Sequence, residues 1–131
     1  MKTLNQTSTA TLNNMVSLME DCYVKIDNSD GTFMPVSVEM IYENDHFKIY
    51  SVAHYHEQCG DLLADPEMCF IYLKSLGLYY PSYFKQDSLG LEQESIIVKD
   101  GEIHGCRPKM QADNTEFANM WLQNIKNQQN L

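Results

Sequence analysis

An amphipathic helix is predicted near the start of the chain. Apolar residues recur there at intervals of three and four residues, the period of one helical face, at Leu12, Met15, Val16, Met19 and Cys22. Ser8 or Thr9 precedes them and is a residue type that caps the first turn of a helix. We therefore expect a helix from Ser8 or Thr9 to about Cys22, packed through its apolar face.

After Cys22 the pattern changes to an alternation of apolar and polar residues, which is typical of half-buried strands. Glycine, proline and short polar connections separate the segments, as expected between antiparallel neighbours. Asp100-Gly101 is a strong hairpin signal, so the last strand pair is expected to meet there. The expected strands cover residues 23–27, 33–42, 47–55, 69–73, 78–84 and 91–99, with the final pair at 96–99 and 102–105.

A second helix is predicted at the C-terminus. Asp113 with Glu116 three residues later approximates a capping box. A single apolar stripe follows, made of Phe117, Met120, Trp121 and Ile125. The Gln- and Asn-rich end is expected to fray, so residues 1–7 and 127–131 are interpreted as loose tails.

These elements predict one α+β domain over residues 1–131. The order is an N-terminal helix, an antiparallel sheet of about six strands and a C-terminal helix, and both helices are expected to cover one face of a curved sheet. A chain of 131 residues is long enough for one core. Because this architecture hosts many unrelated functions, the fold class does not identify an activity.

Charge is the most informative feature of the composition. The chain carries 18 acidic and 9 basic residues, a net charge of −9, and Arg107 is its only arginine. Such a surface repels nucleic acid and anionic lipid. It also has almost none of the arginine guanidinium groups that bind phosphate through two hydrogen bonds, so we expect no direct nucleic-acid binding. A partner protein with a basic surface is the positive expectation, and simple solubility is the alternative.

The remaining composition favours a cytoplasmic protein. No apolar run approaches the roughly 20 residues that cross a bilayer, and the first residues lack the apolar core of a secretory signal. We therefore expect no membrane association and expect the cysteines to remain thiols, at Cys22, Cys59, Cys69 and Cys106.

The densest polar segment, residues 54–68, is predicted to be an ordered loop that follows a strand. His54 and His56 are two residues apart, so a metal site is conceivable with a third ligand such as Asp61 or Glu67. The carboxylates also permit an acid–base pair, whereas turn and capping roles are their commoner use. The spacing matches no strong metal or catalytic motif, so we expect no cofactor and do not predict an enzyme.

Aromatic residues gather between residues 72 and 84. Tyr80 and Tyr83 belong to a run that places tyrosines on both faces of a strand. One face must be core, and the other is either an exposed patch that binds a basic partner or is also half-buried.

Several of these residues also form a recognisable pattern. The chain resembles a small uncharacterised domain found in proteins of phages, plasmids and integrative elements, sometimes beside anti-restriction genes. The resemblance covers about residues 33–93, with His56 and Cys59 standing where the pattern has tyrosine and asparagine. It rests on His54-Tyr55, Gln58, Gly60-Asp61, Asp65-Pro66, Met68, Tyr80-Pro81, Gln86-Asp87 and Gly90.

The resemblance implies a setting in a bacterial host cell and no particular chemistry. Together with the charge it leads to the hypothesis of an acidic inhibitor of a host defence nuclease, of the anti-CRISPR or anti-restriction type, whose carboxylates occupy a nucleic-acid groove. A metal-dependent hydrolase and a homodimeric interaction module remain the alternatives. The candidate binding residues are His54, Tyr55, Gln58, Asp61, Asp65, Glu67, Tyr80, Tyr83, Glu92 and Glu94.

Overall fold

The computed structural model describes all of residues 1–131 and confirms the α+β fold. Six antiparallel strands form one sheet in the order β1-β2-β3-β4-β5-β6, so each strand pairs with its neighbours in sequence. The strands are β1 (Tyr23–Ile26), β2 (Val36–Glu43), β3 (Phe47–Gln58), β4 (Asp61–Leu73), β5 (Leu78–Gln86) and β6 (Leu91–Glu94), with the short 3-10 helix η1 (Asp87–Leu89) before β6.

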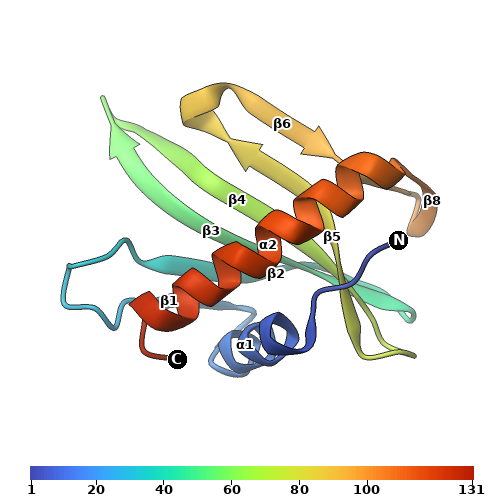
Figure 1. Ribbon diagram of the computed structural model, residues 1–131, viewed down its shortest axis with the longest axis horizontal. Coiled ribbons are helices and arrows are strands. Elements are labelled where there is room, and N and C mark those ends of the chain that lie inside the picture. Colours follow the sequence, from blue (N-terminus) through green and yellow to red (C-terminus); the bar gives the residue numbers. More distant parts are fainter.

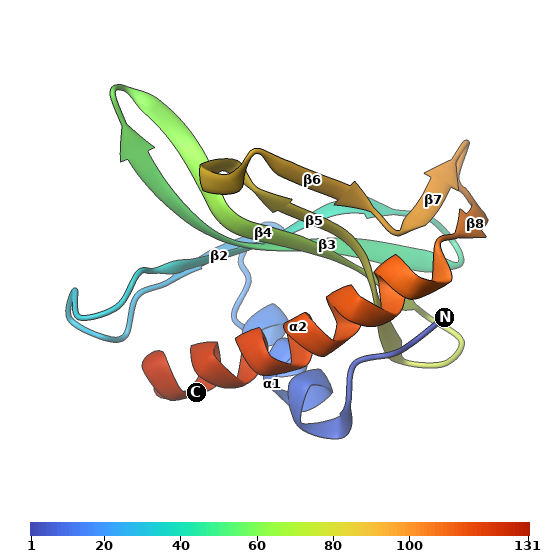
Figure 2. The same ribbon diagram turned by 45° about the horizontal axis from the view of Figure 1, so that its top comes forward.

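Two helices, α1 (Gln6–Ser17) and α2 (Pro108–Gln128), lie against the same face of this sheet (Figure 1). In Figure 2 both helices lie below the sheet, and the β3–β4 hairpin projects upward, away from α2. Neither helix is long and apolar enough to span a membrane. The main core therefore lies between the helices and the sheet, and its largest fully buried side chains include Leu12, Phe70, Tyr79, Leu122 and Ile125.

The alternation of β2 and β3 explains which face is covered. Val38 of β2 and Val52 of β3 are fully buried, are partners in the ladder and belong to the main core. Their sequence neighbours Glu39 and Ser51 point to the opposite side, because successive side chains of a strand alternate. We call this opposite side the outer face.

A second, smaller sheet packs on the outer face. It consists of β7 (Ile96–Lys99) and β8 (Glu102–Cys106), joined at Asp100-Gly101 as the sequence predicts. The segment expected as one strand over residues 91–99 is thus divided at Ser95 between two sheets. Ile96 forms a small second core with residues from the outer face, namely Phe47, Ile71 and Tyr80.

The prediction of a loop over residues 54–68 is wrong. These residues form the last part of β3, the first part of β4 and the tight turn between the two strands. Gln58 pairs with Asp61, and Cys59 and Gly60 form the turn with φ of 54° and 84°. Two-residue hairpin turns require such positive φ values. Leu62 and Leu63 supplied the apolar positions that a strand needs, but the dense polar residues around them concealed the pattern.

Both helices begin earlier than predicted. The side chain of Asn5 accepts a hydrogen bond from the backbone N–H of Ser8 at 2.8 Å and caps α1 in place of Ser8 or Thr9. α1 ends at Ser17 rather than Cys22. α2 starts with Pro108 in its first turn, where backbone N–H groups have no acceptor within the helix, so the missing N–H of proline costs no hydrogen bond. Asp113 therefore lies inside the helix and does not cap it.

The chain ends, expected to be loose, both contact the body of the protein. Leu4 is buried and its N–H donates to the carbonyl of Tyr79 at 3.0 Å. Gln129 is fully buried, and its Oε1 accepts from the N–H of Asn28 at 2.7 Å. Long-range hydrogen bonds of this kind leave no pattern in the local sequence.

Candidate functional site

The outer face carries a groove between the main sheet and β7. Its volume is about 310 Å³. One part of the wall is apolar and the other carries carboxylates and a phenol. The lining residues are Ile41, Ile49, Glu67, Cys69, Ser82, Tyr83, Glu94, Ile96 and Val98. We call this cavity the outer groove.

Glu67 lies at the centre of the polar part of the outer groove, and its carboxylate is held in place. Its Oε2 accepts a hydrogen bond from the hydroxyl of Ser51 at 2.6 Å and lies 3.4 Å from the hydroxyl of Tyr55. Both donors come from β3, the strand paired with β4. These contacts orient the carboxylate on the outer face.

Burial and negative charge raise the pKa values of the neighbouring acidic groups. Burial, followed by the charge of Glu67, raises the pKa of Tyr55 and that of Cys69 to about 12 each. Burial also raises the pKa of Tyr83, with a further contribution from Glu92. These phenols and this thiol therefore stay protonated at neutral pH.

Glu92 and Glu94 extend the negative charge along β6. In the ladder Glu94 faces Tyr83 and Glu92 faces Lys85, so both project from the outer face. Both side chains are exposed. Glu39 of β2 adds a further exposed carboxylate close enough to raise the pKa of Tyr55.

None of these carboxylates forms an ion pair within the chain. The ion pairs join Lys74 to Glu43, Lys85 to Asp87 and Lys109 to Asp113. Lys85 stands opposite Glu67 and Glu92 in the ladder, but its ammonium lies 3.6 Å from Asp87 instead. The outer groove is consequently bordered by uncompensated negative charge.

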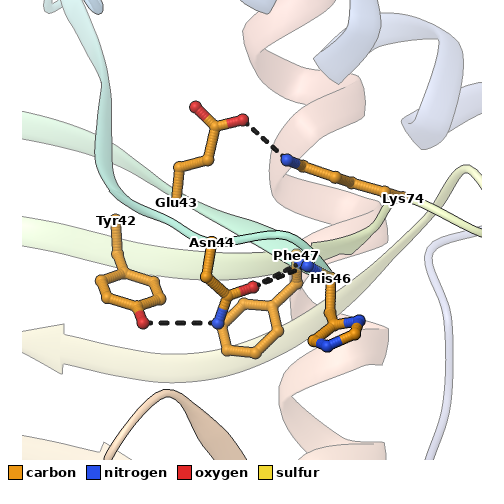
Figure 3. A network of polar contacts seen from close by, with 6 residues as sticks. All are labelled: Tyr42, Glu43, Asn44, His46, Phe47 and Lys74. Atoms are coloured by element: carbon orange, nitrogen blue, oxygen red, sulfur yellow. Dashed lines mark hydrogen bonds and ion pairs between the residues drawn. The ribbon is translucent and has the colours of Figure 1, made fainter.

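A polar network at the β2–β3 turn (Figure 3) also contacts the β7–β8 hairpin. The side-chain oxygen of Asn44 accepts from the backbone N–H groups of His46 and Phe47 at 2.8 and 2.9 Å. Its amide nitrogen donates to the carbonyl of Gly101, in the β7–β8 turn, at 2.9 Å. Glu43 and Lys74, 2.8 Å apart, join the same turn to the end of β4.

The structure brings together some of the residues predicted from the sequence. Tyr55, Glu67, Tyr83, Glu92 and Glu94 share the outer face. Tyr83 and Glu67 are on the same side because Tyr83 pairs with Cys69, which lies two residues after Glu67 in β4. These five residues and the apolar wall of the outer groove form the candidate site.

The other predicted residues lie elsewhere. His54 is buried, its Nδ1 is 2.9 Å from the carbonyl oxygen of Pro35, and its ring stands edge-on to Trp121 of α2. Gln58 and Asp61 are exposed beside the β3–β4 turn. Asp65 accepts a hydrogen bond from Ser88 at 2.8 Å, and Tyr80 is buried in the second core.

The histidines do not form the conceivable metal site. No three or more side chains of His, Cys, Asp or Glu are placed to hold a metal ion. The tyrosine run does not form an exposed aromatic patch either, because Tyr79, Tyr80 and Phe84 are buried and Tyr83 is half-buried.

Sequence reasoning missed several residues of the site. The sequence pattern indicates only strand positions for Ser51, Cys69 and the apolar wall. It indicates Glu39 only as a polar residue between core residues. The alternation in residues 36–42 places Glu39 and Ile41 on one face, which was the available signal. No signal in the sequence shows that Ile96 and Val98 fold back over that face.

A family model described as "Domain of unknown function (DUF6908)" matches residues 6–131. The search of curated proteins and the search of solved structures found no match.

Proposed function

Because the chain belongs to the DUF6908 family, a domain of unknown function, we propose its function from the candidate site: the protein acts by binding a basic surface of another protein through its outer face. The observation that carries this proposal is a set of outer-face carboxylates that form no ion pair within the chain, namely Glu67 and Glu94 in the outer groove and Glu92 beside it on β6.

Two physical features favour protein binding. Uncompensated carboxylates on one face attract a positively charged surface and accelerate its association. The apolar part of the outer groove supplies area that leaves water on contact, which contributes affinity that charge alone does not. Interfaces commonly combine such an apolar centre with a polar rim.

The biological setting proposed is that of a phage or mobile-element accessory protein in the bacterial cytoplasm. The partner proposed there is a host defence nuclease, which the protein inhibits in the anti-CRISPR or anti-restriction manner. A nuclease presents lysine and arginine to nucleic acid, and carboxylates in a fixed arrangement compete for the same cations. The net charge of −9 and the outer-face carboxylates support the binding of such a cationic surface.

Charge reversal on the outer face tests the proposal. Glu92→Lys with Glu94→Lys changes two exposed residues of β6; Glu92 is hydrogen-bonded to Tyr83, and neither glutamate forms an ion pair within the chain. The control pair, Glu20→Lys with Glu116→Lys, alters the net charge equally at exposed positions that do not line the outer groove. Each protein is immobilised, exposed to bacterial lysate and washed with increasing salt, and the retained proteins are identified by mass spectrometry.

We expect the unaltered protein and the control pair to retain a basic nucleic-acid enzyme that salt releases, and whose purified form is inhibited by both. The β6 pair is expected to lose both retention and inhibition. Equal retention by the two pairs, or an interaction that salt does not weaken, would contradict binding through the outer-face charges.

A further inference from the structure

We propose that the outer groove receives a single arginine side chain of the partner protein. The aliphatic stem of the arginine lies along the isoleucine wall, and its guanidinium group reaches Glu67 and Glu94. This inference rests on the proposed function and specifies which chemical group the outer face recognises.

The size of the outer groove matches one long side chain. Its volume of about 310 Å³ is at the lower end of the roughly 300–1,000 Å³ of small-molecule sites. Ile41 and Ile49 form one side and Ile96 and Val98 the other, so the middle of the groove is apolar. Long cationic side chains bury their methylene groups on such walls while the charged end reaches a polar group.

The charged end of the outer groove is prepared for a cation. Oε2 of Glu67 is occupied by Ser51 and Tyr55, whereas its Oε1 accepts no hydrogen bond from the chain. Glu94 lines the same cavity and is exposed. Because Lys85 is turned to Asp87, an incoming cation displaces no ion pair of Glu67.

The surroundings favour arginine over lysine. A guanidinium group presents several N–H donors in one plane, so it can bond two carboxylates at once, and it is more weakly hydrated than an ammonium group. The ring of Tyr83 also lines the groove, and guanidinium groups stack on aromatic rings. Lysine offers a compact charge that satisfies fewer of these acceptors.

Peptide binding followed by NMR tests this inference with the full-length, isotope-labelled protein. The probe is the capped tripeptide acetyl-Gly-Arg-Gly-amide, compared with tripeptides that contain lysine or the neutral isostere citrulline in the central position. We expect the arginine peptide to shift the backbone signals of groove residues, notably Ile49, Cys69 and Val98. The citrulline peptide is expected to bind at least about tenfold more weakly, since its hydrogen bonds lack the charge.

Two variants assign the site. Glu67→Gln is expected to weaken arginine-peptide binding about tenfold, whereas Glu116→Gln, on the exposed side of α2, leaves it unchanged. Ile41→Arg provides a second route, because Ile41 is 51% exposed and its replacement places a guanidinium group in the groove without disturbing the core. This variant is expected to reduce binding of the arginine peptide.

Equal binding of the arginine and citrulline peptides, or shifts spread over acidic residues on all sides of the molecule, would overturn the arginine site. If the β6 charge reversal abolishes capture of the partner while the arginine peptide fails to bind, the inferred arginine site is wrong and the proposed function stands. If the peptide binds the groove but charge reversal leaves partner capture intact, the proposed function fails instead.

Discussion

The hydroxyl of Ser51 donates a hydrogen bond of 2.6 Å to Oε2 of Glu67, which joins β3 to β4 in the middle of the outer face. Ser51 is buried and Glu67 is half-buried, so the carboxylate is partly withdrawn from water but has a donor within the chain. A carboxylate oriented in this way presents its other oxygen in one direction. The outer groove therefore has a fixed acidic group rather than a freely rotating one.

Replacing Ser51 with alanine is expected to destabilise the protein by about 1–2 kcal/mol, because Glu67 loses a charge-assisted hydrogen bond and keeps only the longer contact with Tyr55. Urea unfolding measures the difference. Ser75→Ala, at an exposed turn residue, serves as the control and is expected to change stability by less than about 0.5 kcal/mol. Equal effects of the two changes would show that the bond is energetically unimportant.

Alkaline pH is expected to destabilise the fold partly through Tyr55, whose pKa rises from 10.0 to about 12 through burial and the charge of Glu67. Between these values the unfolded chain releases the proton while the folded protein retains it. The stabilisation is therefore complete below about pH 10 and is lost as the pH rises toward 12. Tyr55→Phe should unfold in urea with a shallower loss of stability over this interval, and an identical pH dependence would argue against the shift.

The cysteines are expected to differ in their reaction with a thiol reagent. Cys69 is buried, and burial together with the charge of Glu67 raises its pKa to about 12, so it forms almost no thiolate at neutral pH. Cys22 and Cys59 are exposed and should be modified first. Timed alkylation with peptide mapping measures the order of modification. Rapid labelling of Cys69 in the folded protein would contradict the burial of this thiol.

Gly101 is expected to be required in the β7–β8 turn. Its φ is +75°, and an added Cβ would lie 3.0 Å from the hydroxyl of Tyr42. Gly101→Ala should therefore cost about 1–2 kcal/mol, measured by thermal unfolding. Gly105 is a matched control in β8, because the nearest atom to its added Cβ is 4.0 Å away, and Gly105→Ala is expected to unfold close to the unaltered protein.

Gln129 is expected to hold the C-terminus to the β1–β2 connection. Its side chain accepts from the N–H of Asn28 at 2.7 Å and donates to the carbonyl of Met34 at 3.1 Å. Gln129→Ala removes both of these part-buried hydrogen bonds, so we expect a loss of about 1–2 kcal/mol and faster amide hydrogen exchange at residues 28–34. Asn127→Ala, at an exposed position, is the control, and equal exchange in both variants would indicate a loose C-terminal end.

The register of the sheet explains why the candidate site was only partly predictable. Alternation correctly separated Val38 from Glu39, because one face of β2 packs on the helices. The same rule fails in β5, where Tyr80 and Tyr83 are three residues apart and yet both pair with outer-face residues of β4, Ile71 and Cys69. The register shift between Cys69 and Phe70 changes the phase of the alternation in β5, and no pattern in the local residues indicates this shift.

The role of His54 shows a second limit. As part of a polar segment it resembled a site residue, but α2 places Trp121 against its ring and the carbonyl of Pro35 beside its Nδ1. A histidine with such partners belongs to the core. Its neighbour Tyr55 projects into the outer face and contacts Glu67 instead.

The amino-acid sequence by itself determined the fold class, the two helices and the Asp100-Gly101 hairpin, because local hydrophobic periodicity and turn chemistry specify each of them over a few residues. It also determined the excess of negative charge. Only the tertiary structure decided that Glu67, Glu92 and Glu94 share a face with the wall formed by Ile41, Ile49, Ile96 and Val98. That arrangement depends on strand register, on the bulges and on the hairpin that Asn44 holds at Gly101, and these are set by contacts between residues distant in the chain.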